Sequence, residues 1–102
     1  MRIKIGARFR SAVCDTEVVV VRAVEDDIEL CCGGPPMLDL GSGRPTGADP
    51  APGAAGGTLV GKRYVDPATS IELLCTKAGA GSLAVDGRLM EIKTAKPLPA
   101  TD

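Results

Sequence analysis

This sequence predicts an all-β protein made of two small β lobes in a pseudo-twofold arrangement, joined by a Gly/Pro-rich linker. Three observations support the prediction: a motif that recurs in the second half of the chain, short β-branched runs bounded by Gly-containing turns, and little support for helix. The only candidate helical window, 50–55, is broken by Pro52 and Gly53. Strands are therefore expected in both halves.

The repeated motif consists of an apolar residue, Gly, any residue, Arg and an aromatic residue. It occupies residues 5–9 and 60–64, so the two aromatic residues of the chain, Phe9 and Tyr64, fall at equivalent positions with an offset of 55. A repeat of this period indicates one structural unit made twice. Farther along, the offset becomes 53 and matches Leu30, Gly34 and Met37 with Leu83, Gly87 and Met90.

The repeat divides the chain into a first lobe at 1–40 and a second lobe at 58–93. Between them, the segment 41–57 contains six Gly and three Pro, which predicts a flexible linker. The segment 94–102 is expected to be a tail. Each lobe alone is about as small as an unaided core can be, so we expect the two to bury their apolar faces against each other.

Within the first lobe, the β-branched run 16–24 predicts a strand, and the alternating residues 28–30 predict a strand that returns beside it. The second lobe repeats this arrangement with strands at 71–75 and 82–85. Each lobe is therefore predicted to be a β-hairpin. The associated turns are expected at 25–27, 32–36, 78–81 and 86–88.

The composition limits the classes of function. Hydrophobic residues make up 44% of the chain and aromatic residues 2%, which predicts a core of Val, Leu, Ile and Ala. A net charge of −1 with no long block of one sign gives no indication of nucleic-acid or membrane binding. The N-terminus lacks the apolar core of a signal peptide, so we expect a cytoplasmic protein with cysteines that are free or metal-bound.

The cysteines of the first lobe lie in a recognisable pattern. Phe9 is followed by Cys14, and then by Leu30-Cys31-Cys32-Gly33 and Met37. This stretch resembles desulforedoxin and the N-terminal domain of desulfoferrodoxin, where the pattern is aromatic, any residue, Cys-x-x-Cys, a hairpin, Leu, any residue, Cys-Cys-Gly, two residues and Met.

The resemblance implies a small β fold in which four thiolates of a rubredoxin-type knuckle hold one iron tetrahedrally, and in which two identical subunits pair. A chain with two copies resembles that pair fused into one polypeptide. The segment 64–90 resembles the same pattern more weakly, with Asp66, Thr69 and Val85 at ligand positions. The second lobe is thus interpreted as a degenerate copy without a metal site.

The first lobe also departs from the family pattern. Ser11 stands where the family has its first cysteine, and a hydroxyl is a far poorer ligand than a thiolate. Counting back from Met37 places the family's Cys-Cys pair at Cys32 and Gly33, whereas keeping Cys31 and Cys32 as the pair requires one extra turn residue. The internal repeat favours the first register, and both remain open at this point.

The predicted site consists of Cys14, Cys31 and Cys32 with Ser11 or water completing the shell around Zn or Fe. The chain has no histidine, and no nucleophile–base or acid–base constellation is visible, so no enzyme is predicted. We expect a non-catalytic accessory or scaffold protein that acts through a protein partner, as a monomeric pseudo-dimer or a homo-oligomer. The alternatives are a one-electron carrier with an Fe–Cys centre and a metal-free interaction module.

Overall fold

A computed structural model describes residues 3–25, 27–40 and 53–93, and these residues form strands and turns without any helix. The predicted all-β class is therefore confirmed. No helix within these ranges could cross a membrane. Most of the predicted linker, the whole of the predicted tail and the centre of the predicted turn at 25–27 lie outside the described residues. The strands are β1 (Arg8–Arg10), β2 (Glu17–Arg22), β3 (Leu30–Cys32), β4 (Leu38–Asp39), β5 (Arg63–Val65), β6 (Glu72–Lys77), β7 (Leu83–Val85), β8 (Arg88–Leu89) and β9 (Glu91–Ile92).

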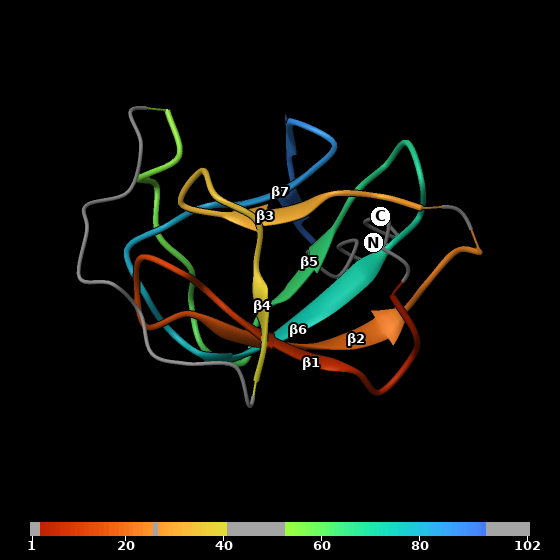
Figure 1. Ribbon diagram of the computed structural model, residues 1–102, viewed down its shortest axis with the longest axis horizontal. Coiled ribbons are helices and arrows are strands. Elements are labelled where there is room, and N and C mark those ends of the chain that lie inside the picture. The colour runs from red at the N-terminus through yellow and green to blue at the C-terminus, as the bar shows by residue number, and fades with distance from the viewer. Residues whose placement is uncertain (1–2, 26, 41–52, 94–102) are drawn as a thin grey trace, which may run out of the picture.

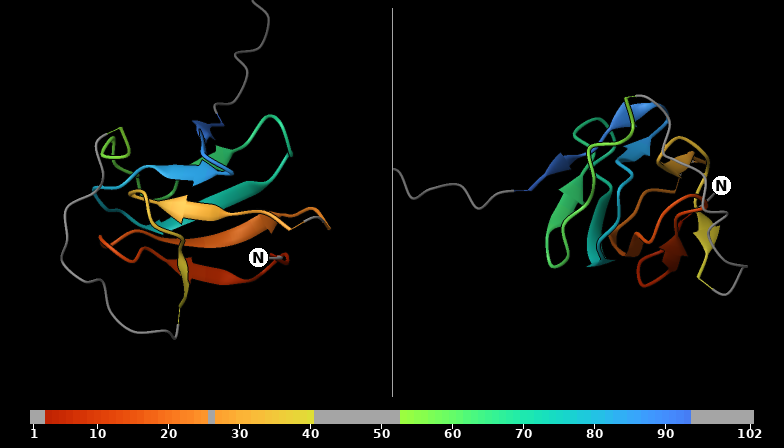
Figure 2. Two further views of the ribbon diagram at one scale, coloured as in Figure 1. Left: turned by 45° about the horizontal axis from the view of Figure 1, so that its top comes forward. Right: turned by 90° about the vertical axis from the view of Figure 1, so that its left-hand side faces the viewer.

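The strands form two sheets, and the smaller sheet covers one face of the larger (Figures 1 and 2). The larger sheet has six strands in the order β4-β1-β2-β6-β5-β9, and the smaller has three in the order β3-β7-β8. Both sheets take strands from both halves of the chain. The two halves therefore share a single core instead of folding around separate ones.

Strands in the two halves correspond at constant offsets. The starts of β5 and β6 are offset by 55 from those of β1 and β2 (63 against 8, 72 against 17). The starts of β7 and β9 are offset by 53 from those of β3 and β4 (83 against 30, 91 against 38). Equivalent residues also face each other where the halves meet: Val19 pairs with Leu74 in the large sheet, and Cys31 pairs with Ala84 in the small one.

The predicted hairpins are wrong. β2 pairs with β1 and β6, whereas β3 belongs to the other sheet and pairs with β7, so residues 28–30 do not return beside 16–24. The predicted ranges 16–24, 71–75 and 82–85 do contain strands, and 28–30 overlaps β3 only at Leu30, whereas β1, β4, β5, β8 and β9 were not predicted. A local pattern of this kind also carries no information about the pairing partner. The hairpins that form instead are β1–β2, its equivalent β5–β6, and β7–β8.

The turn after β7 has a conformation that its sequence favours. Asp86 and Gly87 have φ angles of 50° and 81°, and Gly33 and Gly34 in the first half have 71° and 113°. Two consecutive residues with positive φ are typical of a type I′ turn, for which Asp-Gly and Gly-Gly are suitable sequences. The predicted turns at 32–36 and 86–88 therefore occupy the places that the sequence indicates.

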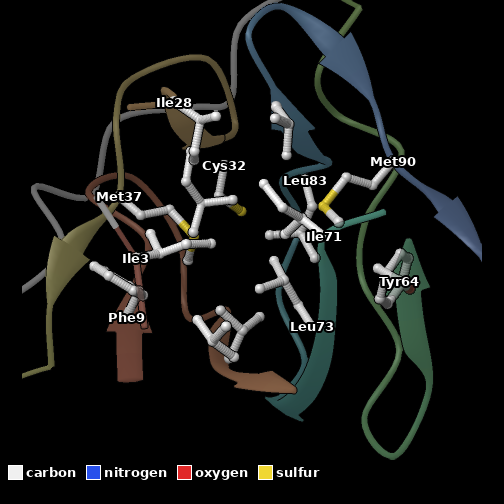
Figure 3. Packing of buried hydrophobic residues seen from close by; sticks show 14 of the residues in the cluster. Ile3, Phe9, Ile28, Cys32, Met37, Tyr64, Ile71, Leu73, Leu83 and Met90 are labelled. Atoms are coloured by element: carbon white, nitrogen blue, oxygen red, sulfur yellow. The ribbon is translucent and has the colours of Figure 1, made fainter. Parts of the chain in front are cut away.

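The core lies between the two sheets and consists mainly of Ile, Val and Leu (Figure 3). Phe9 and Tyr64 are buried at opposite ends of the cluster, with Met37 and Met90 respectively on their sides of it. Cys75 is only 1% exposed, as expected of a small hydrophobic residue within a strand. Other core residues are Val18, Val20, Leu30, Ile71, Leu73, Leu83 and Val85.

Candidate thiol and metal site

The first element of the site is the turn at 11–16, which links β1 to β2. Ser11 is fully buried, and its Oγ accepts hydrogen bonds from the amides of Val13 at 3.1 Å and Cys14 at 3.2 Å. Its own hydroxyl donates to the carbonyl of Cys32 at 3.4 Å. The Ser11 Oγ thus holds the backbone of its own turn together. The same hydroxyl also bonds the turn to β3.

Two of the predicted ligands come together here. The Sγ atoms of Cys14 and Cys32 lie 3.9 Å apart although 18 residues separate them in the chain. Cys32 is completely buried on β3, whereas Cys14 is only partly buried in its turn. The edge of a tetrahedral thiolate site is roughly 3.8 Å for metal–sulfur bonds of about 2.3 Å. The two sulfurs thus have the spacing of two neighbouring ligands on one ion.

Cys31 is directed elsewhere. Neighbouring residues of a strand point to opposite sides, and the Cys31 thiol donates to Glu29 Oε1 at 3.2 Å. The structure therefore brings Cys14 to Cys32, with Ser11 beside them, and places the Cys31 sulfur in a different contact. This is the register in which Cys32 and Gly33 occupy the family's paired positions.

A segment of the second half covers the thiols. The loop 78–82 connects β6 with β7, and the amide of Gly81 donates to Cys14 Sγ at 3.4 Å. A Cβ atom on Gly81 would lie only 2.8 Å from the Cα and N of Gly33 and 3.1 Å from Cys32 Sγ. Only glycine permits this approach. The interpretation of 78–81 as a hairpin turn is wrong, because the segment passes from one sheet to the other.

Thr16 is a further residue of the site that the sequence did not reveal. Its Oγ1 lies 3.2 Å from Cys14 Sγ and 2.7 Å from Thr58 Oγ1, and Thr58 in turn accepts from the amide of Gly79 at 3.2 Å. A Cβ on Gly79 would collide with Thr16. The only signal in the sequence was the pair of glycines at 79 and 81, whose contacts depend on the pairing of distant strands.

The surroundings of Cys14 favour its thiolate. Partial burial opposes ionisation, but hydrogen bonds from Ser11, Thr16 and the Gly81 backbone outweigh it and lower the pKa of Cys14 to about 7. A thiol with this pKa is substantially ionised at neutral pH, and the thiolate is the form that binds metals and attacks electrophiles.

The other two thiols of the first half are held in the protonated form. Burial raises the pKa of Cys32 to about 12, with the charge of Cys14 as the next cause. Burial also raises the pKa of Cys31 to about 11, together with the hydrogen bond to Glu29 and the charge of that residue. Of the two neighbouring sulfurs, Cys14 is therefore the one that ionises first as pH rises.

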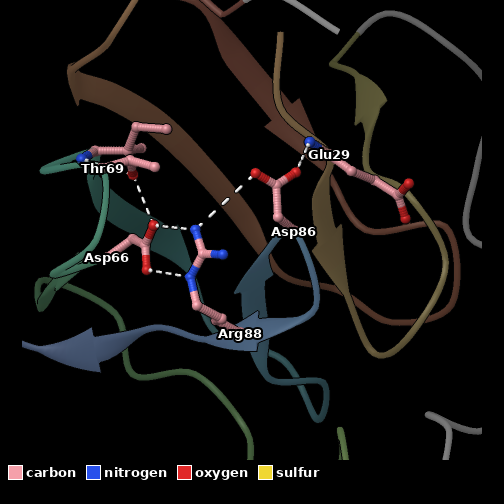
Figure 4. A network of polar contacts seen from close by, with 6 residues as sticks. Glu29, Asp66, Thr69, Asp86 and Arg88 are labelled. Atoms are coloured by element: carbon pink, nitrogen blue, oxygen red, sulfur yellow. Dashed lines mark hydrogen bonds and ion pairs between the residues drawn. The ribbon is translucent and has the colours of Figure 1, made fainter. Parts of the chain in front are cut away.

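The equivalent place in the second half holds an ion pair (Figure 4). Asp66, the equivalent of Ser11 in the repeat, is 1% exposed and accepts from Arg88 Nη2 at 3.0 Å and Nε at 3.4 Å. Thr69, the equivalent of Cys14, donates its hydroxyl to Asp66 at 2.6 Å. Burial raises the pKa of Asp66, but the hydrogen bonds and charge of Arg88 with the bond from Thr69 lower it overall.

This polar network reaches the first half. Asp86 lies 4.0 Å from Arg88 Nη2, and its Oδ1 accepts from the amide of Glu29 at 2.8 Å (Figure 4). Sequence reasoning treated Arg88 only as a turn residue. Its role was not visible because 22 residues separate it from Asp66.

The residues present do not fit a four-thiolate iron centre. The four family positions hold Ser11, Cys14, Cys32 and Gly33, and Ser11 already uses its oxygen in hydrogen bonds with the turn. Gly33 has no side chain, and Gly81 packs closely against it. Within residues 3–25, 27–40 and 53–93, no three His, Cys, Asp or Glu side chains gather in a group that could hold a metal. What remains is one pair of neighbouring sulfurs, those of Cys14 and Cys32.

An apolar pocket of about 300 Å³ is lined by residues from the stretch 56–92. Leu59, Leu89 and Ile92 line it and are 55%, 55% and 41% exposed. The equivalent residues of the first half are Lys4, Pro36 and Asp39. At these three positions the second half therefore presents a more apolar surface than the first.

No family model, no curated protein and no solved structure matches this chain.

Proposed function

We propose that this protein is a small, non-catalytic accessory protein whose first half binds one thiophilic divalent ion, Zn²⁺ or Fe²⁺, through Cys14 and Cys32. The observation that carries the proposal is the 3.9 Å separation of the two sulfurs. Two thiolates supply part of a tetrahedral shell, and water or another small ligand completes it. When bound, the ion would supply a cross-link between the turn at 11–16 and β3.

The chain's own residues prepare this pair for an ion. The hydrogen bonds that lower the pKa of Cys14 also hold its thiolate in place before any ion binds. Cys32 must lose its proton on binding, so the affinity for the ion increases as pH rises. Ser11 acts here as a positioning residue, because its oxygen holds the amides of the turn that presents Cys14.

The internal correspondence supports a desulforedoxin-like pair fused in one chain, with a pseudo-twofold axis between its halves. Val19 faces Leu74 and Cys31 faces Ala84, and each pair consists of equivalent residues. A twofold axis that passes between the two members of each pair would produce this pairing. The ancestral site would then persist in part in the first half and be replaced by Asp66 and Arg88 in the second.

A protein partner in the cytoplasm belongs to the same proposal. The exposed apolar residues around the pocket of the second half support it, because apolar side chains that gather on a surface are typical of sites of interaction. The free thiols fit a reducing compartment.

The test is a competition titration of the reduced full-length protein with Zn²⁺ and a chromophoric chelator. We expect one ion per chain, with binding lost in Cys14→Ser and in Cys32→Ser. Cys31→Ser and Cys75→Ser are the matched controls, because their sulfurs contact Glu29 and Lys77 instead, and both should bind as the wild type does. Equal binding by the wild type and Cys14→Ser would refute the site and favour a metal-free interaction module.

A further inference from the structure

The contact between Cys14 and Cys32 also suits a reaction that needs no metal. Their sulfurs are 3.9 Å apart, whereas the thiols of Cys31 and Cys75 bond to oxygens of Glu29 and Lys77. A disulfide needs a sulfur–sulfur distance of about 2.05 Å. Cys14 is only partly buried, so its sulfur is the one with room to move and close the remaining gap.

We propose that Cys14 and Cys32 form a reversible intramolecular disulfide, which makes the first half of the protein a redox-sensitive site. This inference uses the same two residues as the proposed metal site, but it does not depend on metal binding. Its oxidant is a small-molecule disulfide such as oxidised glutathione.

Exposure assigns different roles to the two sulfurs. Cys14 is partly exposed and can meet an external disulfide, whereas Cys32 is completely buried and cannot. The Cys14 thiolate attacks one sulfur of the oxidant, which forms a mixed disulfide and releases one thiolate. Cys32 then loses its proton and attacks Cys14 Sγ, which releases the second thiolate of the oxidant. The protein loses two electrons, and the oxidant becomes two thiols.

The loop from the second half favours this order of events. The Gly81 amide donates to Cys14 Sγ, so the attacking sulfur stays in place above Cys32. The loop also packs against Gly33 and leaves no room for a side chain at residue 81. The loop therefore shields Cys32, and the partly exposed Cys14 is the sulfur that an oxidant can reach.

The second half cannot undergo the same reaction, because Thr69 and Val85 stand at the equivalent positions. Oxidation would therefore act on one half alone. It would also remove both thiolates from the proposed ion site, so disulfide formation and metal binding exclude each other. That last consequence rests on the proposed function.

The test equilibrates metal-free, full-length protein with buffers of reduced and oxidised glutathione, followed by acid quenching, unfolding, alkylation and intact-mass spectrometry. We expect a species with two alkylated thiols in place of four. The ratio of this oxidised protein to the reduced protein should be proportional to the concentration of oxidised glutathione divided by the square of that of reduced glutathione. Cys31→Ser and Cys75→Ser should still form the disulfide. Cys32→Ser should stop at a mixed disulfide with glutathione on Cys14, and Cys14→Ser should form neither product.

Four alkylated thiols at every ratio would overturn the inference, as would a disulfide that disappears in Cys31→Ser and survives in Cys32→Ala. Circular dichroism of each variant shows whether it is folded, and so distinguishes loss of the disulfide from loss of the fold. If the Cys32 variants do not fold, Cys14→Ser provides the test, because Cys14 is only partly buried and its substitution disturbs the core less. A disulfide in protein that binds no Zn²⁺ would refute only the proposed function. Zn²⁺ binding without a disulfide would refute only this inference.

Discussion

Two equivalent turns of this molecule, at 11–16 and at 66–71, are fastened to the small sheet by different chemistry. In the first half the contact joins Cys14 to Cys32, and the Ser11 hydroxyl also reaches the Cys32 carbonyl. In the second half Asp66 accepts two hydrogen bonds from Arg88 on β8. Both contacts tie a turn of the large sheet to the small one.

Comparing the two turns shows what the fold requires of the residue at position 11 and at its equivalent, position 66. The residue at 11 or 66 must satisfy hydrogen-bonding groups of its own turn and also reach the opposite sheet. A hydroxyl does this through neutral hydrogen bonds, and a carboxylate does it through a charge shared with Arg88. The fold therefore does not need a thiolate at this position.

The largest effect that we expect comes from Ser11→Cys. Two amides already point at the γ atom of residue 11, so a third thiolate placed there would be stabilised for binding. We predict that the affinity for Zn²⁺ rises on the order of 100-fold, equivalent to about 2.7 kcal/mol, and that the melting temperature with Zn²⁺ rises by linkage. Thr69→Cys in the second half is the control, and this single thiol should gain no metal.

Chelator competition and thermal unfolding with and without Zn²⁺ measure both quantities. If Ser11→Cys remains folded but binds Zn²⁺ no better than the wild type, the turn has moved away from a metal-binding geometry.

Alanine at the two equivalent positions should give unequal losses of stability. Asp66→Ala removes a buried charge-assisted network and should cost about 2 kcal/mol, because hydrogen bonds to charged groups contribute more than neutral ones. Ser11→Ala removes only neutral bonds and should cost about 1 kcal/mol in metal-free protein. Urea unfolding measures both values, and equal losses would contradict the contrast between the two halves.

The ion pair of the second half also predicts a response to acid. Because Asp66 has a lowered pKa in the folded protein, its contribution to stability is complete above its unfolded pKa and is lost as pH falls through the folded value. Stability should therefore decline below about pH 4. Asp66→Asn should show a smaller decline. Glu72 should contribute to the decline that remains in Asp66→Asn, because a hydrogen bond from Lys93 lowers the pKa of Glu72 in the folded protein. Urea unfolding at a series of pH values measures the decline, and an unchanged decline in Asp66→Asn would assign the acid sensitivity to other groups.

A smaller difference concerns thiol reactivity, for which the second half has no counterpart. In metal-free protein, iodoacetamide should modify Cys14 with a midpoint at about pH 7, while Cys31 and Cys32, with pKa values of about 11 and 12, should react little at pH 8. Peptide mass spectrometry over a range of pH measures the three rates. A midpoint for Cys14 near 9 would mean that its hydrogen bonds do not stabilise the thiolate.

Much of the fold could be predicted because local patterns determine it. The predicted ranges 16–24, 71–75 and 82–85 contain strands, although five short strands were missed. The Gly-containing turns at 32–36 and 86–88 have the conformation that their residues favour, and the offsets of 55 and 53 identified equivalent positions. The pairing of β2 with β6 could not be predicted, because pairing over such a separation depends on the packing of both halves.

The same distinction applies to the site. Cys14, Cys32 and Ser11 were suggested by the resemblance to the desulforedoxin pattern. Cys31 was suggested with them but contacts Glu29 instead, and Thr16, Gly81 and Arg88 were missed. Gly81 reaches Cys14 across 67 residues, and Arg88 reaches Asp66 across 22. These contacts exist only once the two halves share a core.

The most direct test of the account is X-ray absorption at the zinc edge, with one Zn²⁺ bound to the reduced wild-type protein. The account predicts two sulfur ligands at about 2.3 Å, with oxygen ligands completing the shell, and three sulfurs in Ser11→Cys. Three or four sulfurs in the wild type would show that Cys31 turns inward as a ligand, and a shell without sulfur would show that the Cys14–Cys32 pair does not bind the ion. Either result would contradict the two-thiolate site.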